Sequence, residues 1–322
     1  MHYSFDYAQQ IHIPHDPLQP GPMYFLVPYK VQVFGIANEA LKMQHNYLNP
    51  ESCTIGKGSD SVISFLHHYF QTYGVGEKNV ILHADNCGGQ NKNRYLMSYL
   101  AYRIINTLHT DITIIFMPVG HTKFYCDLAF GLFKKKFKRT QVSDLQELEN
   151  CVINSTPTSN LNKCQLVGNE DGSRINVNQY NWSEWFEEVG FTSLPGIRKY
   201  HYFKFQSSNP NFVLVKEKST DEYISVNLIE NYHPTTPFPE KSVLPKITFE
   251  RQKYLFDKIR QYCAFESQDQ LCPDPTRGFF VETSVATLNT TTRLTDRIRA
   301  ISKCSVCQKP GHNKAKCPNK PQ

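Results

Sequence analysis

The stretch from Val80 to Arg94 constrains the fold of this chain more than any other. It consists of a short apolar run that ends in Asp85, a turn of Gly, Asn and Gln residues, and then a helical pattern. An apolar run bounded in this way predicts a buried strand that delivers an acid to the edge of a sheet. Asp85 is therefore our first candidate for a catalytic residue.

The segments around this stretch predict strands and helices in a definite order. Strand-like runs and helical spacing of apolar residues predict, in chain order, strands over 1–10, 23–27 and 31–36, a helix over 60–73, a strand over 80–85, a helix over 94–108, a strand over 112–117 and a helix that opens near 120. This order is expected of an α/β protein in which helices flank a mixed sheet, as in a ribonuclease-H-like core.

The composition changes after residue 150. Polar residues predict a connector over 151–180, aromatic strand-like runs predict a small β-rich module over 181–231, and prolines indicate a linker with helical segments over 232–302. We therefore expect a core over 1–150, followed by these three parts and by a zinc knuckle over 303–318.

Three aspartates stand where this topology brings side chains together: Asp6 on the first strand, Asp85 after the fourth, and Asp127 at the start of a later helix. Carboxylates in close contact repel unless cations neutralise them, and Mg²⁺ and Mn²⁺ prefer oxygen ligands. The three residues therefore predict a catalytic site for Mg²⁺ or Mn²⁺. Each also has a structural interpretation, as an outward strand residue, a turn residue and a helix cap respectively.

The segments around these acids resemble a known family. Residues 4–10, 83–93 and 120–127 are similar to those of a transposon-derived family of integrase-like proteins, and the resemblance covers roughly residues 1–210. It implies a ribonuclease-H-like transposase core with an acidic triad, which falls on Asp6, Asp85 and Asp127. Transposases of this kind act as dimers or larger assemblies, so the resemblance also implies a homo-oligomer.

Two features leave alternatives open. Asp144, Glu147 and Glu149 lie on the next helical segment, and one of them could replace Asp127 as the third ligand. The chain begins five residues before Asp6, whereas transposases carry a DNA-binding region ahead of the core. We therefore expect a truncated or repurposed copy.

Basic residues follow the third aspartate. The run from Lys134 to Arg139 predicts either a solvated helix face, a nuclear localisation signal or a surface that follows a nucleic-acid backbone. Because a polyanionic substrate must be held beside a metal site, we predict the following nucleic-acid contacts: Lys92, Lys123, Lys134, Lys135, Lys136, Lys138 and Arg139.

The last part of the chain carries the strongest local motif. Cys304, Cys307, His312 and Cys317 have the ligand number and the compact spacing of a Cys₃His zinc knuckle. Zn²⁺ would supply the folding energy of so short a loop, and the lysines around it suit single-stranded nucleic acid. A further zinc site, made of His83, Cys87, His121 and Cys126, is disfavoured because their spacing matches no zinc-binding pattern.

Composition limits the remaining possibilities. A chain of 322 residues with 40% hydrophobic residues can bury a sizeable core, and the net charge of +6 permits a polyanionic partner. Its longest apolar run, 112–119, is far shorter than the roughly 18 residues that span a bilayer, so we expect no membrane association. The sparse cysteines predict a reducing compartment, nuclear or cytoplasmic.

The sequence therefore supports two main hypotheses. The first is an enzyme, a divalent-metal-dependent nuclease or strand transferase that acts on DNA or RNA. The second is a catalytically inactive protein that keeps the fold and the knuckle and binds nucleic acid or protein. A weaker third hypothesis is a protein-interaction adaptor that binds no nucleic acid.

Overall fold

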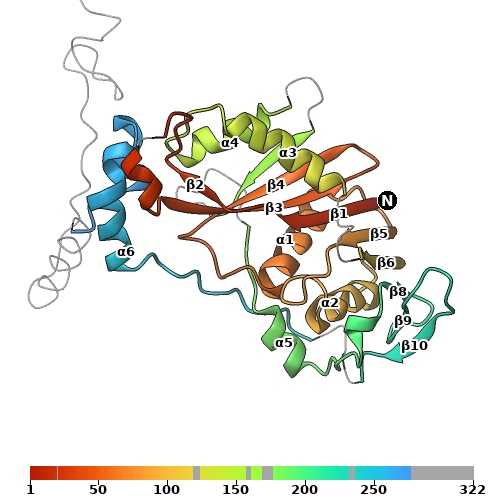
Figure 1. Ribbon diagram of the computed structural model, residues 1–322. Coiled ribbons are helices and arrows are strands. Elements are labelled where there is room, and N and C mark those ends of the chain that lie inside the picture. Colours follow the sequence, from red (N-terminus) through yellow and green to blue (C-terminus); the bar gives the residue numbers. More distant parts are fainter. Residues whose placement is uncertain are drawn as a thin grey trace, which may run out of the picture. The chain divides into compact units, whose positions relative to one another are not determined.

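The computed structural model describes residues 1–19, 21–118, 124–156, 161–168, 177–230, 232 and 236–276 (Figure 1). Residues Met1–Pro275 form one compact unit. The predicted knuckle residues, Cys304, Cys307, His312 and Cys317, lie outside the described ranges. Within these ranges, no helix has both the length and the apolar character needed to cross a membrane.

A mixed sheet of ten strands runs through this unit. Its strands are β1 (His2–Tyr7), β2 (Ile11–Ile13), β3 (Tyr29–Asn38), β4 (Met43–Pro50), β5 (Asn79–Ala84), β6 (Asp111–Phe116), β7 (Asn162–Leu166), β8 (Tyr202–Gln206), β9 (Phe212–Lys216) and β10 (Ile224–Asn227). They lie in the order β10-β9-β8-β6-β5-β1-β3-β4-β7, and β2 pairs with β3.

The central strands combine both directions of pairing. β3 runs antiparallel to β1 and β4, whereas β5 runs parallel to β1 and β6. At the two sides of this group, β7 is parallel to β4, and β8 is antiparallel to β6. The prediction of an α/β fold with a mixed sheet flanked by helices is confirmed.

Helices cover both faces of the sheet (Figure 1). They are α1 (Ser59–Thr72), α2 (Arg94–Ile105), α3 (Tyr125–Phe137), α4 (Leu145–Ile153), α5 (Trp182–Glu188), α6 (Phe249–Tyr254) and α7 (Gln268–Leu271), with a short 3₁₀ helix, η1 (Gly21–Phe25). Figure 1 shows α1 and α2 on one side of the central strands and α3 and α4 on the other.

Strand alternation divides the core in two. Tyr3, Phe5 and Ile36 point into a cluster with residues of α1, α2 and α5, whereas Val31 and Val33 point into a second cluster with residues of α3 and α4. Because successive side chains of a strand alternate between faces, Ser4 and Asp6 lie on the side of α3.

Two features fix α3 against the sheet. Gly35 of β3 has no side chain, and a Cβ there would come within 2.6 Å of the Phe130 ring, so glycine allows this ring of α3 to pack on the strand. A buried chain of amides then joins the sheet to the helix: Asn46 Nδ2 donates to Asn162 Oδ1, and Asn162 Nδ2 donates to the carbonyl of Ala129. Both contacts hold the first half of α3 over β3 and β4.

The structure differs from the sequence-based expectation in three places. Residues 23–27, predicted as a strand, belong largely to η1, since Pro22 lies in its first turn, where the fixed φ of proline favours a helical backbone. β2 and β7 are additional strands. β8, β9 and β10 were expected in a separate module over 181–231, yet β8 pairs with β6 and extends the large sheet.

Candidate acidic site

Asp6 and Asp85 lie at the same level of two adjacent strands. β1 and β5 are parallel, with Ser4 opposite His83, so continuing this register by two residues brings Asp6 level with Asp85. Side chains two residues apart on a strand share a face, so both aspartates lie on the face of Ser4, the side covered by α3. Asp85 directly follows β5, as the sequence predicts.

α3 brings Asp127 to this pair. The thiol of Cys126 lies 3.2 Å from the backbone oxygen of Ser4 and 3.6 Å from its hydroxyl, which places the first turn of α3 directly over β1. Asp127 is the next residue in that turn. Its carboxylate accepts a hydrogen bond from the backbone N–H of Phe124 at 3.0 Å and so caps the helix.

The electrostatics of Asp6 reflect this arrangement. Burial, with the negative charges of Asp85 and Asp127, raises the pKa of the Asp6 carboxyl to about 7, and the backbone N–H of Tyr7 and the charge of Lys134 oppose part of this rise. Asp6 therefore carries a proton for part of the time at neutral pH. The same interactions show that Asp85 and Asp127 both lie close enough to Asp6 for their charges to act on it.

Each carboxylate retains one oxygen for another partner. Asp85 Oδ1 accepts from the backbone N–H of Cys87 at 3.0 Å and from Asn91 Nδ2 at 2.6 Å. Asp6 Oδ1 accepts from the N–H of Tyr7 at 2.7 Å. Within the described ranges, the second carboxylate oxygen of each has no hydrogen-bond donor.

Asn91 adds a further oxygen beside Asp85. Its side chain is fully buried, and its Oδ1 has no hydrogen-bond partner among the described residues. A buried amide oxygen without a donor is unfavourable unless a water or a ligand satisfies it. The oxygens of Asp6, Asp85, Asp127 and Asn91 are chemically suited to Mg²⁺ or Mn²⁺.

The acids are not arranged as a closed metal site. Within the described ranges, no group of three or more His, Cys, Asp or Glu side chains is positioned to hold a metal ion. The acids converge on one region, so a cation there would require their side chains to draw together. The predicted magnesium or manganese site therefore stays a prediction.

The alternative third ligands are engaged elsewhere. Asp144 caps α4 by accepting from the backbone N–H of Glu147, and its other oxygen accepts from the Ser267 hydroxyl at 2.6 Å. Glu147 accepts from the backbone N–H of Ser143. Asp127, and none of these residues, influences the pKa of Asp6, which favours Asp127 as the third acid.

The loop after Asp85 is held by internal hydrogen bonds. The carbonyl of Cys87 accepts from the backbone N–H groups of Gln90, Asn91 and Lys92, and Asn93 caps α2. The ammonium of Lys92 donates to Asn86 Oδ1 at 2.9 Å and to the carbonyl of Arg198 at 3.1 Å. Lys92 is only 5% exposed, so its contacts in this conformation stabilise the loop.

The predicted basic surface lies on the second half of α3 and just beyond it. Lys135, Lys136, Lys138 and Arg139 are exposed, whereas Lys134 is half-buried and lies close enough to Asp6 to lower its pKa. Lys123 and His121 lie outside the described ranges. Four cations are therefore free to contact a polyanion, and a fifth lies between them and the acids.

Lys57 is a residue of this region that sequence analysis did not identify. Its ammonium lies 5.2 Å from the centre of the Tyr7 ring, and the charge of Asp6 raises the pKa of Lys57 while burial lowers it more strongly. Lys57 precedes α1 and is distant from Asp6 in the sequence, so only the fold shows that it accompanies the acids.

A family model described as a domain of unknown function, DUF7869, matches residues 26–222. The chain belongs to this family. The DUF7869 match includes Asp85 and Asp127 and begins after Asp6. No curated protein and no solved structure matches the chain.

Proposed function

We propose that this DUF7869 protein binds nucleic acid and that its core is a ribonuclease-H-like nuclease or strand transferase dependent on Mg²⁺ or Mn²⁺. The observation that carries the proposal is the convergence of Asp6, Asp85 and Asp127 from two parallel strands and a covering helix, with the pKa of Asp6 raised to about 7. Acids arranged in this way are typical of sites that act on phosphodiesters through divalent cations.

The topology supports the proposed core. Five of the strands lie in the order β4-β3-β1-β5-β6, with antiparallel pairing among the first three and parallel pairing among the last three. α1 connects β4 to β5, α2 connects β5 to β6, and α3 follows β6. Along the chain, strands are thus followed by alternating helices and strands, which is the order expected of a ribonuclease-H-like core.

Each of these side chains would have its own role in binding the cations. Asp6 and Asp85 would hold cations between the strands, Asp127 would approach from above, and Asn91 Oδ1 would complete the set of oxygens. When bound, the cations would activate a water or a 3′-hydroxyl and stabilise the leaving oxygen. Because Asp6 is partly protonated at neutral pH, cation binding would displace a proton from it, and affinity for the cation would rise with pH.

The sheet offers a surface for the substrate beside Asp85. On the face that carries Asp85, the strands from β5 to β9 present half-buried side chains that are neither core nor fully exposed: Ile81, His83, Thr113, Ile115, Tyr202, Lys204, Leu214 and Lys216. Lys216 lies 5.4 Å from the centre of the Tyr202 ring. Cationic and aromatic groups of this kind suit a nucleic-acid strand that runs past the acids.

The predicted knuckle completes the proposal. Cys304, Cys307, His312 and Cys317 would bind Zn²⁺, and the lysines around them would contact single-stranded DNA or RNA. This part would add affinity while the acids supply chemistry.

A catalytically inactive binding protein is the second candidate. Asp85 fixes the turn to Cys87, Asp127 caps α3, and the acids form no closed metal site within the described ranges. Aspartates retained for such structural roles would persist in a protein that only binds nucleic acid. The same basic and aromatic surfaces would then serve binding alone.

Cleavage of labelled single-stranded and duplex DNA and RNA in Mg²⁺ or Mn²⁺ separates the two candidates. We expect metal-dependent cleavage by the wild-type chain and a loss of roughly 100-fold or more in Asp85→Asn, the size of effect seen when a group that stabilises the transition state is removed. Asp111→Asn is the matched control, because Asp111 begins the adjacent strand β6, at the end far from Asp85.

The outcomes are distinct. Equal cleavage by wild type and Asp85→Asn would refute the acidic site as the catalytic centre. Binding of nucleic acid without cleavage in either Mg²⁺ or Mn²⁺ would favour the catalytically inactive candidate.

A further inference from the structure

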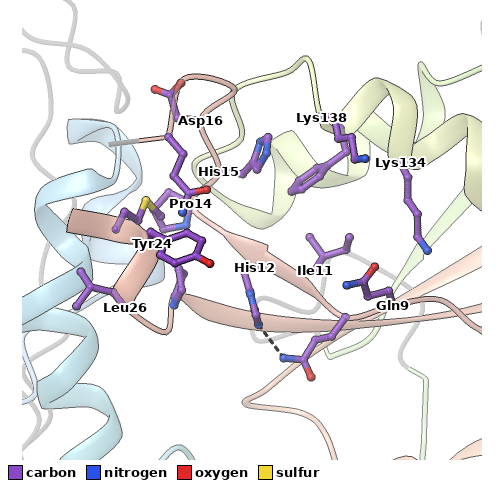
Figure 2. Close-up of a pocket in the computed structure, with 15 residues that line it drawn as sticks. Gln9, Ile11, His12, Pro14, His15, Asp16, Tyr24, Leu26, Lys134 and Lys138 are labelled. Atoms are coloured by element: carbon purple, nitrogen blue, oxygen red, sulfur yellow. Dashed lines mark hydrogen bonds between the residues drawn. The ribbon is translucent and has the colours of Figure 1, made fainter. Parts of the chain in front are cut away.

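A pocket of about 450 Å³ is lined in part by Lys134, whose charge also acts on Asp6 of the acidic site (Figure 2). Its walls come from the loop after β1, from β2, from η1 and from the second half of α3. Figure 2 shows Lys134 and Gln9 at one end of the pocket and Tyr24 and Leu26 at the other. A volume of this size is typical of pockets that bind small molecules.

We propose that this pocket binds one nucleotide of a single-stranded nucleic acid, with its base against Tyr24 and its phosphate between Lys134 and Lys138. This inference rests on the proposed function and extends it, because it names the form of the substrate and the place where the strand is anchored next to the acids.

Tyr24 provides a surface for a base. Its side chain is 77% exposed and lies at the edge of the pocket. The ring is therefore not part of the protein core. A base that stacks on an exposed aromatic ring removes apolar area from water on both sides. Ile11 and Leu26 add apolar walls to the pocket.

Amide side chains line the same pocket. Gln9 and Gln10 follow Asp6 closely in the chain, and the amide nitrogen of Gln10 lies 3.0 Å from Nε2 of His12. An amide carries both a donor and an acceptor, and because Gln9 lies at the same end of the pocket as Lys134, its amide suits the sugar and phosphate of the nucleotide. The pocket thus combines a stacking surface at one end with polar and cationic groups at the other.

Cations lie at the opposite end from Tyr24. Lys134 and Lys138 project from α3 into the pocket lining, one turn apart on the helix. Lys134 also lowers the pKa of Asp6, so the pocket and the acidic site share this residue. A phosphate held by these lysines would therefore place the next phosphodiester of the strand toward the acids.

The charge favours a nucleic acid over a protein partner. Leu18 and Phe25, which are close to Tyr24 in the sequence, are also exposed, at 89% and 83%, and exposed apolar residues of this kind could dock a protein. Phe25, however, does not line the pocket, whereas both lysines do. A polyanion is the partner that satisfies the lysines and the aromatic ring together.

The test uses the full chain without added Mg²⁺ or Mn²⁺ and without a chelator, so that binding is measured without metal-dependent cleavage while zinc stays available to the predicted knuckle. The probe is a short single-stranded DNA that carries one 2-aminopurine, whose fluorescence falls when it stacks, and fluorescence anisotropy gives the dissociation constant. We expect quenching with wild type and, in Tyr24→Ala, roughly 5- to 100-fold weaker binding without quenching. Phe25→Ala is the matched control, because Phe25 is the adjacent exposed aromatic residue, and it should stay within about twofold of wild type.

The lysines are tested by salt dependence. Lys138→Gln should reduce the slope of log affinity against log salt by about 0.7, the loss of one phosphate contact on a single strand. Lys218→Gln, an exposed lysine in the turn between β9 and β10, should leave the slope unchanged. Displacement of the probe by free adenosine monophosphate at low concentration would identify a free nucleotide as the ligand and would overturn the assignment to a strand.

Two results would overturn the pocket while leaving the acidic site in place. One result is that Tyr24→Ala quenches the 2-aminopurine fluorescence as much as wild type does. The other is an equal loss of binding affinity in Tyr24→Ala and Phe25→Ala, which would indicate a broad apolar docking face. Asp85→Asn should keep the quenching. Normal quenching by a wild-type chain that cleaves no nucleic acid in Mg²⁺ or Mn²⁺ would refute the catalytic proposal and retain the pocket.

Discussion

Asp6→Asn should stabilise the protein above neutral pH. Burial and the neighbouring acids raise the pKa of Asp6 from an ordinary value of 3.8 to about 7. The folded protein therefore keeps a proton that the unfolded chain releases near pH 4. The stability associated with Asp6 is fully present below pH 4 and falls as the pH rises to about 7.

The magnitude follows from the two pKa values. A change from 3.8 to about 7 corresponds to about 4 kcal/mol, and water that reaches the half-buried carboxyl reduces this to about 2–3 kcal/mol. Asparagine has nearly the same shape, can still accept from the N–H of Tyr7 and cannot ionise. At pH 8 the variant should therefore exceed wild type in free energy of unfolding by about 2–3 kcal/mol, and at pH 4 the two should nearly coincide.

Urea denaturation of both proteins at pH 4, 6 and 8 measures this difference, and comparison at equal pH cancels the contribution of other titrating groups. Saturating Mg²⁺ should stabilise wild type at pH 8 and should have little effect on the variant, because the cation neutralises the ionised carboxylates. A difference in unfolding free energy that is the same at pH 4 and pH 8 would refute the argument that burial and charge repulsion govern Asp6.

Three further predictions concern other parts of the chain. Trp182→Ala should lower the free energy of unfolding in urea by about 3–5 kcal/mol, because the indole is fully buried in the core shared by α1, α2 and α5. Unfolding should remain a single transition, and a second, separate transition would instead support an independent module over residues 181–231. Burial lowers the pKa of His45 and His68 to about 4 and of His67 and His109 to about 3, so the stability that these neutral rings contribute should be present above pH 6.5 and fall as the pH drops from 6.5 toward 4. Their imidazole NMR signals should remain those of neutral rings at pH 5.5, and titration near 6.5 would contradict this. Cys307→Ser should remove bound zinc in metal analysis and weaken binding to single-stranded nucleic acid, and a wild-type chain without zinc would refute the knuckle.

The spacing of apolar residues predicted the helices and strands that are long and bury one face. The helix predicted to open near residue 120 corresponds to α3, in which Phe130, Phe133 and Phe137 lie at helical spacing and are buried. β2 and β7 were missed because they are short or polar, and their strand conformation depends on pairing with β3 and β4. Pairing between distant segments carries no local signal, and the same reason explains why the junction of β8 with β6 was not predicted.

Some residues of the candidate site could likewise be predicted from the sequence, and others could not. The order of elements predicted that Asp6 and Asp85 would meet, because parallel neighbouring strands bring their ends to one edge of the sheet. It did not predict Lys57 or the role of Gly35, since both depend on how closely one element packs on another. Asn91 was recognised as a polar turn residue, but its buried and unpartnered oxygen is visible only in the structure.

α3 contributes residues to both the candidate acidic site and the pocket. Its first turn provides Asp127, the ring of Phe130 seats it on Gly35, and its later turns provide Lys134 and Lys138. Gly35 is also the residue that pairs with Asp6 across β1 and β3, so the contact that seats the helix is adjacent to the most perturbed acid. A bulkier residue at position 35 would displace α3 and would therefore move Asp127, Lys134 and Lys138 together. Variants at the two ends of the helix, in contrast, should separate cleavage from binding, because each end contributes a different charge to a different ligand group.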